Sequence, residues 1–247
     1  MSQPHEGHVA VVTGAATGIG RAIAERMASD GAKVALADVQ SSAETKDAIE
    51  AAGGSCLEVT CDITNPAQVE ALRGSVDESL GVCDILINNA GIYPFAPFEE
   101  IDFDGWRKML SVNLDSQFLL CRQFLPKMKD AGWGRIINMS SGSTWLVVGG
   151  DTAYTASKAG VVGLTRALAT EVAPFGITVN AVAPSIVRTG TTEAMMDDLL
   201  EEYSQTQAIK RVETPADLVG PVSFLASEDA EFITAQVLMV DGGRARP

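Results

Sequence analysis

The chain has 247 residues, of which 46% are hydrophobic, and 18 Lys and Arg against 32 Asp and Glu give it a formal net charge of −14. This length and apolar content suit one α/β domain with a large buried core. The acidic balance argues against nucleic acid and anionic membranes as partners, because like charges repel.

The N-terminal stretch MSQPHEGHVAVV has neither the basic start nor the cleavage pattern of a signal peptide. No apolar run reaches the ~18–20 residues that span a bilayer, so we expect a cytoplasmic protein. Both histidines stand within the first eight residues, which argues against histidine acid–base chemistry. The cysteines form no CxxC pair and predict reduced thiols without a metal site; they are Cys56, Cys61, Cys83 and Cys121.

Strand and helix patterns alternate along the chain. Short apolar or β-branched runs predict strands at 8–15, 33–38, 55–62, 83–91, 134–141, 176–184 and 235–243. Helical spacing predicts helices at 18–31, 42–54, 66–81, about 104–131, 153–173 and 215–227. A polar, methionine-containing stretch (191–210) precedes the last of these helices. We therefore predict one α/β domain over residues 1–247: a doubly wound (Rossmann) fold with a parallel seven-stranded sheet and helices on both faces.

The first predicted strand ends in a glycine-rich loop, TGAATGIG (13–20). Gly14, Gly18 and Gly20 permit a tight turn and a close approach of a ligand to the backbone. The following helix presents free N–H groups to a pyrophosphate. Glycine turns also close strand–helix junctions that bind nothing, but the strand before the loop and the helix after it favour a dinucleotide site.

Asp38 ends the second predicted strand, 18 residues after Gly20. A carboxylate at this place can accept hydrogen bonds from the adenosine ribose hydroxyls, and it repels a 2′-phosphate. Neither GAAT in the loop nor VQSS after Asp38 contains a Lys or Arg that would hold such a phosphate. The pattern favours NAD over NADP, although a helix-capping or solvated aspartate fits the same position.

The sequence YTASK (154–158) places a tyrosine four residues before a lysine. On a helix these side chains share one face. A free tyrosine titrates near ~10, and a nearby cation lowers the pKa of a phenol. An ordinary pair on a helix surface is the alternative, which this motif alone leaves open.

Together these motifs resemble the short-chain dehydrogenase/reductase family over essentially the whole chain. TGAATGIG matches the cofactor loop of the family, NNAG (88–91) its motif after the fourth strand, and YTASK its YxxxK motif. Further matches are Asp62 in CDIT, Asn113 in SVNL and Ser141, which stands 13 residues before Tyr154. The resemblance implies an oxidoreductase that moves a hydride between its substrate and a nicotinamide cofactor.

The resemblance also implies a role for each of four catalytic residues. Tyr154 gives a proton to the substrate oxygen or takes one from it, and Lys158 lowers the pKa of the phenol and holds the nicotinamide ribose. Ser141 hydrogen-bonds the substrate oxygen, and Asn113 places a water that links the lysine to solvent. Ser140 competes with Ser141 at a less suitable spacing, with backbone capping as its alternative role.

The family match extends the expected cofactor site beyond the glycine loop. The turn after the sixth strand departs from the family pattern, because Pro184-Ser185 replaces the usual Pro-Gly and leaves the turn conformation open. The predicted cofactor-binding residues are Gly14, Thr17, Gly18, Ile19, Gly20, Asp38, Asp62, Ile63, Asn89, Ala90, Gly91, Tyr154, Lys158, Pro184, Val187 and Thr189.

Three segments form the substrate pocket in this family, and here their side chains are mainly aromatic, aliphatic or methionine, with Arg188 the one basic exception. A charged substrate calls for basic anchors, so we expect a small, neutral, hydrophobic alcohol or ketone. A segment at about 188–212 is expected to cover it. The predicted pocket residues, some of which are expected to be core or subunit contacts instead, are Tyr93, Phe95, Ser143, Trp145, Leu146, Thr191, Met195 and Met196.

Three stretches, NNAGIYPFAPFEE, WGRIINMSS and APSIVRTGTTEA, resemble the branch of the family that interconverts 1-phenylethanol and acetophenone with NAD. Reduction of a 3-oxoacyl thioester, or oxidation of a sugar or steroid, stays open on the same frame. A non-enzymatic nucleotide-binding protein is a third alternative, which the complete catalytic set disfavours. Family members are commonly homotetramers, and the resemblance implies the same here.

Overall fold

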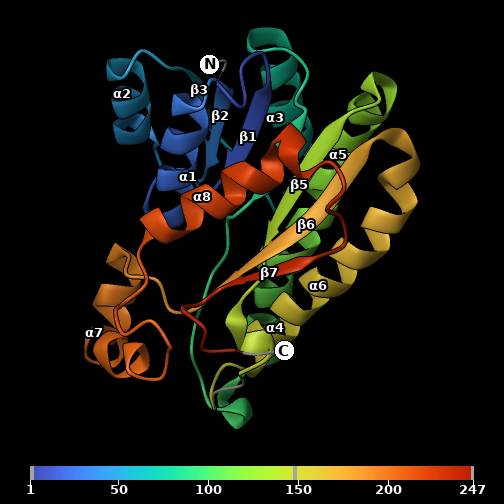
Figure 1. Cartoon of the computed structure of the whole chain (residues 1–247). Coiled ribbons are helices and arrows are strands. Elements are labelled where there is room, and N and C mark those ends of the chain that lie inside the picture. The colour runs from blue at the N-terminus through green and yellow to red at the C-terminus, as the bar shows by residue number, and fades with distance from the viewer. Residues whose placement is uncertain (1–2, 147–148, 246–247) are drawn as a thin grey trace.

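The structure is a computed structural model that describes residues 3–146 and 149–245, without the side chains of 196–198 (Figure 1). Over these residues, seven parallel strands form one sheet in the order β3-β2-β1-β4-β5-β6-β7. The predicted fold class is confirmed. The strands are β1 (Val9–Thr13), β2 (Lys33–Asp38), β3 (Ser55–Thr60), β4 (Ile85–Asn88), β5 (Gly134–Met139), β6 (Ile177–Pro184) and β7 (Val237–Val240).

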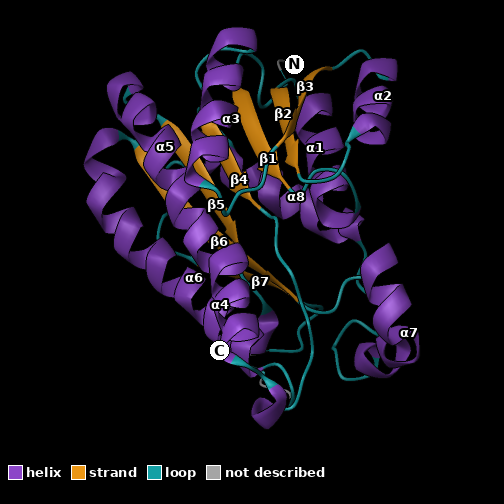
Figure 2. Ribbon diagram, turned by 180° about the vertical axis from the view of Figure 1, so that it is seen from behind, coloured by secondary structure: helices purple, strands orange, loops and turns teal. Residues whose placement is uncertain are grey.

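Helices cover both faces of the sheet. Helices α1 (Gly18–Ser29) and α8 (Pro215–Ala226) lie on one face, with α2 (Ala43–Ala51) beside α1 (Figure 1). The other face carries α3 (Pro66–Ser79), α5 (Ser116–Ala131) and α6 (Thr152–Val172), with α4 (Phe103–Leu110) near the end of α6; Figure 2 shows these from behind. Within the described part of the chain, no helix is both long and apolar enough to cross a membrane.

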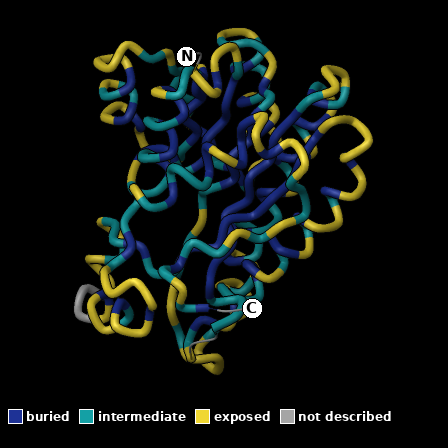
Figure 3. Tube along the Cα trace, viewed as in Figure 1, coloured by how far each residue is buried: buried dark blue, intermediate teal, exposed yellow. Residues whose placement is uncertain are grey.

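The core consists of two apolar layers because successive side chains of a strand point to opposite faces. Ile85 and Ile87 of β4 pack in the layer that contains residues of α1 and α8. Leu86, between them, packs in the opposite layer with Leu72 of α3 and Phe124 of α5. In Figure 3 the inner strands are accordingly almost entirely buried, whereas the edge strands β3 and β7 are only partly buried. Burial of each such side chain contributes roughly 1.5–3 kcal/mol to folding.

Two elements differ from their sequence-based prediction. The long helix expected at about 104–131 is divided into α4, a π-helical turn at Ser111–Asp115, and α5. The polar stretch after 190 forms a helix, α7 (Gly190–Ser204), which begins with a reciprocal capping pair between Thr189 and Thr192. A capping pair of two threonines lacks the Glu or Gln that usually identifies a helix start in sequence.

All seven strands end at the same edge of the sheet because they are parallel. The chain winds outward in opposite directions from the neighbouring strands β1 and β4, and ligands of doubly wound folds bind at this switch point, beyond the carboxyl ends of the strands. Helix α7 stands apart from the sheet beyond this edge, at the lower left of Figure 1, and much of it is exposed in Figure 3.

Candidate active site

The glycine loop forms a cradle between β1 and α1. Gly14 and Gly18 have positive φ values of 66° and 59°, which side chains with a Cβ rarely adopt. A Cβ added to Gly20 would lie 1.9 Å from the Gly14 carbonyl oxygen, so only glycine fits there. Thr17, the N-cap residue of α1, makes no side-chain hydrogen bond to the helix. The first N–H groups of α1 are therefore not capped by Thr17 and are free to bind an anion.

Asp38 is held against this loop at the end of β2. One carboxylate oxygen accepts a hydrogen bond from the Ala16 N–H at 3.0 Å, and the other accepts one from the Gln40 N–H at 3.0 Å. Arg21 of α1 pairs with Glu25 and Glu44. The carboxylate thus has a defined position beside the loop.

The segments after β3 and β4 complete this side of the site. The Asp62 carboxylate accepts hydrogen bonds from the N–H and hydroxyl of Thr64 at 2.9 and 2.7 Å, and Ile63 is buried. The Asn89 amide donates to the Thr13 and Gly14 carbonyl oxygens at 2.9 and 3.3 Å, which ties the segment after β4 to the glycine loop.

Tyr154 and Ser141 line one cavity and interact with each other. Burial raises the pKa of Tyr154, a hydrogen bond with Ser141 acts in the opposite direction, and the negative charge of Asp151 raises it further. Ser140 has a different contact: its hydroxyl donates to the Lys158 carbonyl oxygen at 3.1 Å, within the buried interior. The geometry therefore brings Ser141 together with the tyrosine and gives Ser140 a backbone partner.

Lys158 lies one turn along α6 from Tyr154 and is 4% exposed. Its Nζ donates to the Met139 carbonyl oxygen at 2.8 Å and lies 5.7 Å from the centroid of the Tyr154 ring. Burial lowers the pKa of Lys158 to about 8. The expected lowering of the Tyr154 pKa is not seen, because burial of the phenol dominates and raises that pKa instead.

Asn113 stands in the π-helical turn between α4 and α5 and is fully buried. Its Oδ1 accepts from the Ile92 N–H at 2.8 Å, while its Nδ2 donates to the Ile92 carbonyl oxygen at 3.0 Å and to Ser157 Oγ at 3.1 Å. A Cβ on Gly91 would come within 3.1 Å of Asn113 Oδ1 and 3.5 Å of Lys158 Nζ. The turn therefore holds Asn113 next to Lys158. Such π-helical turns are frequent at functional sites.

The Pro184-Ser185 turn needs no glycine. Among the described residues other than glycine, only Ala235 has a positive φ, so Ser185 is unstrained. The Ser185 N–H donates to Glu213 Oε2 at 2.8 Å, and Val187 pairs with Glu213 as an isolated β-bridge. Burial raises the pKa of Glu213 to about 8.

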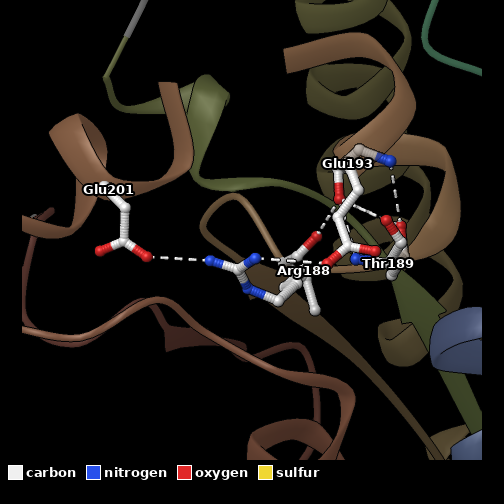
Figure 4. Close-up of polar contacts among 6 residues, drawn as sticks. Arg188, Thr189, Glu193 and Glu201 are labelled. Atoms are coloured by element: carbon white, nitrogen blue, oxygen red, sulfur yellow. Dashed lines mark hydrogen bonds and ion pairs between the residues drawn. The ribbon is translucent and has the colours of Figure 1, made fainter. Parts of the chain in front are cut away.

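Arg188 does not line the cavity. Its guanidinium pairs with Glu193 at 3.2 Å and with Glu201 at 2.9 Å, and the next residue, Thr189, is the N-cap of α7 (Figure 4). The basic residue expected in the pocket is instead occupied with the acids of α7.

A cavity of about 850 Å³, including its open mouth, lies at the carboxyl edge of the sheet. A smaller cavity of about 450 Å³ adjoins it and is lined by Asn89, Gly91 and Lys158. The two share four lining residues, which are Ile19, Tyr93, Tyr154 and Pro184. Tyr154 therefore stands where the predicted cofactor site and the larger cavity meet.

The predicted pocket residues divide into two groups. Tyr93, Ser143 and Leu146 line the larger cavity. Phe95 and Trp145 do not line it: Phe95 lies against Gly150, and Trp145 follows the short helix at Gly142–Thr144. Thr191 and Met195 do not line it either and are exposed on α7. The side chain of Met196 lies outside the described residues.

Some lining residues were absent from the sequence-based set. They are Asp151, Ile186, Asp241 and Arg244. Tyr203 of α7, which the sequence places in the segment expected to cover the substrate, also lines the cavity. The Arg244 guanidinium lies 4.3 Å from the centroid of the Tyr203 ring, over its face. Asp151 could have been found from its spacing, because it precedes Tyr154 by three residues on a helix. No local motif identifies Asp241 and Arg244, which reach the cavity because β7 ends beside β6.

Comparison with known proteins agrees with this geometry. The sequence family described as Enoyl-(Acyl carrier protein) reductase matches residues 14–245. The chain is 40% identical to L-2,3-butanediol dehydrogenase of Corynebacterium glutamicum over 95% of this chain and 97% of that protein. It is 37% identical to the 3-oxoacyl-[acyl-carrier-protein] reductase FabG of Vibrio cholerae over 96% and 97%.

A solved structure from Beutenbergia cavernae, provisionally described as an NAD(P)-dependent gluconate 5-dehydrogenase, superimposes with a TM-score of 0.93 at 40% identity over 99% of both chains. That structure contains NADP at low occupancy. This chain has features that fit a dinucleotide too: the glycine cradle, the Asp38 carboxylate beside it, and Lys158 in the smaller cavity. The fold, the family match and the relatives lead to one conclusion: the chain is an oxidoreductase of the short-chain dehydrogenase/reductase family, which uses a nicotinamide cofactor.

Proposed function

We propose that the protein is an NAD-dependent dehydrogenase that interconverts a neutral, hydrophobic secondary alcohol, such as 1-phenylethanol or another aryl carbinol, and its ketone. The observation that carries the proposal is the position of Tyr154 and Ser141 on the wall of a largely apolar cavity, beside the cavity that contains Lys158. Tyr93, Leu146 and Ile186 supply aromatic and aliphatic surface there.

The chemistry follows from the protonation states of these residues. A nicotinamide bound beside Lys158 would supply the acceptor for a hydride from the carbinol carbon, or the donor of one to the carbonyl carbon. Because burial raises the pKa of Tyr154 from its ordinary value, the neutral phenol is favoured and can donate its proton to the oxygen of a ketone. Ser141 stabilises the charge that develops on this oxygen. In the oxidation direction Tyr154 must accept the proton, so alkaline pH favours that direction.

Lys158 and Asn113 support the tyrosine. With a pKa of about 8, Lys158 is mainly cationic at neutral pH and would hold the hydroxyls of the nicotinamide ribose. Asn113 lies next to Lys158 through Ser157 and Gly91, a position suited to hold a water that replaces the proton used in the reaction. Removal of either side chain should affect proton transfer more than substrate binding.

Asp38 supports the preference for NAD. Its carboxylate is fixed by the Ala16 and Gln40 N–H groups at the place expected for the adenosine ribose. Arg21, an arginine of the helix that follows the glycine loop, is engaged by Glu25 and Glu44. A 2′-phosphate would meet the Asp38 carboxylate without a dedicated cation, which disfavours NADP.

The segment at about 188–212 is proposed to cover the substrate. It contains α7, and its Thr189, Thr192 and Tyr203 line the larger cavity. The pairs of Arg188 with Glu193 and Glu201 join the start of this segment to α7 itself (Figure 4).

Two other substrates of the same family were considered. A 3-oxoacyl thioester carries an anionic carrier group, and the cavity offers Arg244 but also the carboxylates of Asp151 and Asp241. A sugar would need many hydrogen-bonding partners in a cavity whose surface is mainly apolar. A non-enzymatic role is disfavoured because Asn113, Ser141, Tyr154 and Lys158 come together at one site.

The test is a steady-state assay of reduced-cofactor formation with NAD and NADP in parallel. Substrates are 1-phenylethanol, a polyol of similar size and, in the reverse direction, acetophenone and an acyl thioester. We expect the highest kcat/KM for 1-phenylethanol with NAD. Turnover of the thioester or the polyol in preference to the aryl substrates would overturn the proposed substrate class.

We also propose a homotetramer, as the family resemblance implies. The large apolar side chains of Phe103 on α4 and Phe118 on α5 are 74% and 51% exposed, and a subunit interface would bury them. Light scattering on the purified protein would show a mass four times that of one chain; a monomer would contradict the proposal.

A further inference from the structure

Asp151 is a buried acid that the proposed chemistry does not use. It is 2% exposed, stands at the N-cap of α6 and lines the larger cavity together with Tyr93 and Tyr154. Its side chain does not cap the helix. Its Oδ1 has no hydrogen-bond partner among the groups that the structure describes. A buried acceptor without a donor costs free energy, which a donor entering the cavity would recover.

The position of Asp151 relates it to the reacting oxygen. It lies three residues before Tyr154, so the two side chains share one face at the start of α6. Asp151, Tyr93 and Tyr154 line the same cavity, and the charge of Asp151 raises the pKa of both tyrosines, in each case less than burial does. In the proposed function the Tyr154 hydroxyl contacts the carbinol oxygen, which would bring the atoms next to the carbinol carbon to the side of the cavity that Asp151 lines.

The other acid of the cavity differs from Asp151 in its contacts. The Asp241 carboxylate accepts hydrogen bonds from the Gly243 N–H at 2.9 Å and the Ala245 N–H at 2.6 Å. Asp241 therefore has backbone partners that hold the chain after β7. Asp151 is less fully satisfied: the Thr155 hydroxyl acts on its pKa, but its side chain caps no helix N–H and its Oδ1 lacks a partner in the part of the chain that the structure describes. A ligand donor would offset the energy cost of burying this oxygen.

We infer that Asp151 is a specificity residue that accepts a hydrogen bond from a hydroxyl next to the carbinol of the substrate. The inference rests on the proposed function and narrows it to vicinal diols and α-hydroxy ketones that carry an apolar group. The same carboxylate disfavours substrates with a carboxylate at that position, because two buried like charges repel.

Three aryl carbinols that differ in one group test this directly: 1-phenylethanol carries a methyl group, 1-phenyl-1,2-ethanediol a hydroxymethyl group and mandelate a carboxylate. Each enantiomer is oxidised separately with NAD, and kcat/KM is measured for the wild type. We expect the diol to exceed 1-phenylethanol by about 10- to 100-fold, the usual contribution of a hydrogen bond to a charged group. Mandelate should be the poorest of the three.

Two variants of Asp151 and one control identify the residue responsible. In Asp151→Ala the preference for the diol should disappear. Asp151→Asn keeps an acceptor without the charge, so its preference for the diol should fall to a few-fold and its kcat/KM for mandelate should rise. Because the side chain caps no helix N–H, both variants should fold, which circular dichroism checks. Asp241→Asn removes the other acid of the same cavity, and its diol preference should stay that of the wild type.

The outcomes separate the inference from the proposed function. If the wild type oxidises 1-phenylethanol but treats the diol equally, or if Asp151→Ala leaves the diol preference unchanged, the inference is wrong and the proposed function stands. If the wild type oxidises none of the three carbinols with NAD, the proposed function fails and the inference fails with it. The inference is supported if the diol preference disappears in Asp151→Ala, falls to a few-fold in Asp151→Asn and keeps its wild-type value in Asp241→Asn.

Discussion

Replacement of Tyr154 by phenylalanine removes one oxygen atom from the site and tests its role as the proton carrier. The ring stays in place, because it packs edge-on against Tyr93 with centroids 4.5 Å apart. The variant loses the hydrogen bond with Ser141, which contributes about 0.5–1.5 kcal/mol to folding. It also loses the positioned acid, whose contribution to rate is typically about 10²–10⁴-fold. We therefore expect a small change in stability and a large loss of kcat.

The matched control is Tyr93→Phe, which removes a phenol hydroxyl from the same cavity. Reduced-cofactor formation from 1-phenylethanol gives kcat for both variants, fluorescence titration gives their affinity for NADH, and urea denaturation gives their free energies of unfolding. We expect Tyr154→Phe to bind NADH like the wild type and Tyr93→Phe to lose less than about tenfold in kcat. If Tyr154→Phe retained more than a tenth of the wild-type kcat, Tyr154 would not be the proton carrier.

Three further predictions concern the cofactor site and stability. Gly20→Ala places a Cβ 1.9 Å from the Gly14 oxygen and should weaken dinucleotide binding about 10²-fold by displacing the loop. The control is Gly74→Ala, whose Cβ meets nothing within 4 Å. Equal dinucleotide affinities of the two variants would contradict the assignment of the glycine loop as the binding site. Asp38→Asn should raise the ratio of kcat/KM for NADP to that for NAD at least about tenfold, since it removes the charge that repels the 2′-phosphate; an unchanged ratio would show that Asp38 does not select the cofactor. The folded-state pKa of Glu213, about 8, exceeds the unfolded value, so wild-type stability should fall as pH rises through the window between them. Urea denaturation at pH 6 and pH 8 should show a loss about 2 kcal/mol larger for the wild type than for Glu213→Gln, and parallel losses would argue against a buried, neutral Glu213.

The sequence predicted the elements that have a clear period or a diagnostic loop. The bounds of β2, Lys33–Asp38, coincide with the predicted strand, and the glycine cradle follows β1 as expected. Helix α7 was not predicted because its cap is a threonine pair and its acids and methionines lack a strong apolar period. The π-helical turn at Asn113 was hidden for a similar reason, since one extra residue in a turn leaves the composition of a helix unchanged.

The candidate site was predictable where a motif names its residues and less so where the fold assembles it. Tyr154, Lys158 and Ser141 come from short patterns and meet in space. Arg244 reaches the cavity only because β7 lies at the edge of the sheet next to β6. Arg188 was expected in the pocket because its sequence context does not reveal its partners. Glu193 and Glu201, 5 and 13 residues further along, reach it only because this segment folds into α7.

The pKa of Tyr154 shows the limit of spacing as evidence. The i,i+4 pair predicted a lowered phenol pKa, whereas burial of the phenol raises it and burial of Lys158 lowers the pKa of the ammonium. Burial of each group opposes its charged form, and sequence spacing contains no information about it.

Transfer of deuterium tests the central claim most directly. The wild-type protein is incubated with NAD and with 1-phenylethanol that carries deuterium at the carbinol carbon, and the cofactor is analysed by mass spectrometry and NMR. The account predicts NADH with the deuterium on the nicotinamide ring, together with acetophenone in equal amount. Acetophenone without a deuterated cofactor, or no reaction with any neutral secondary alcohol, would contradict it.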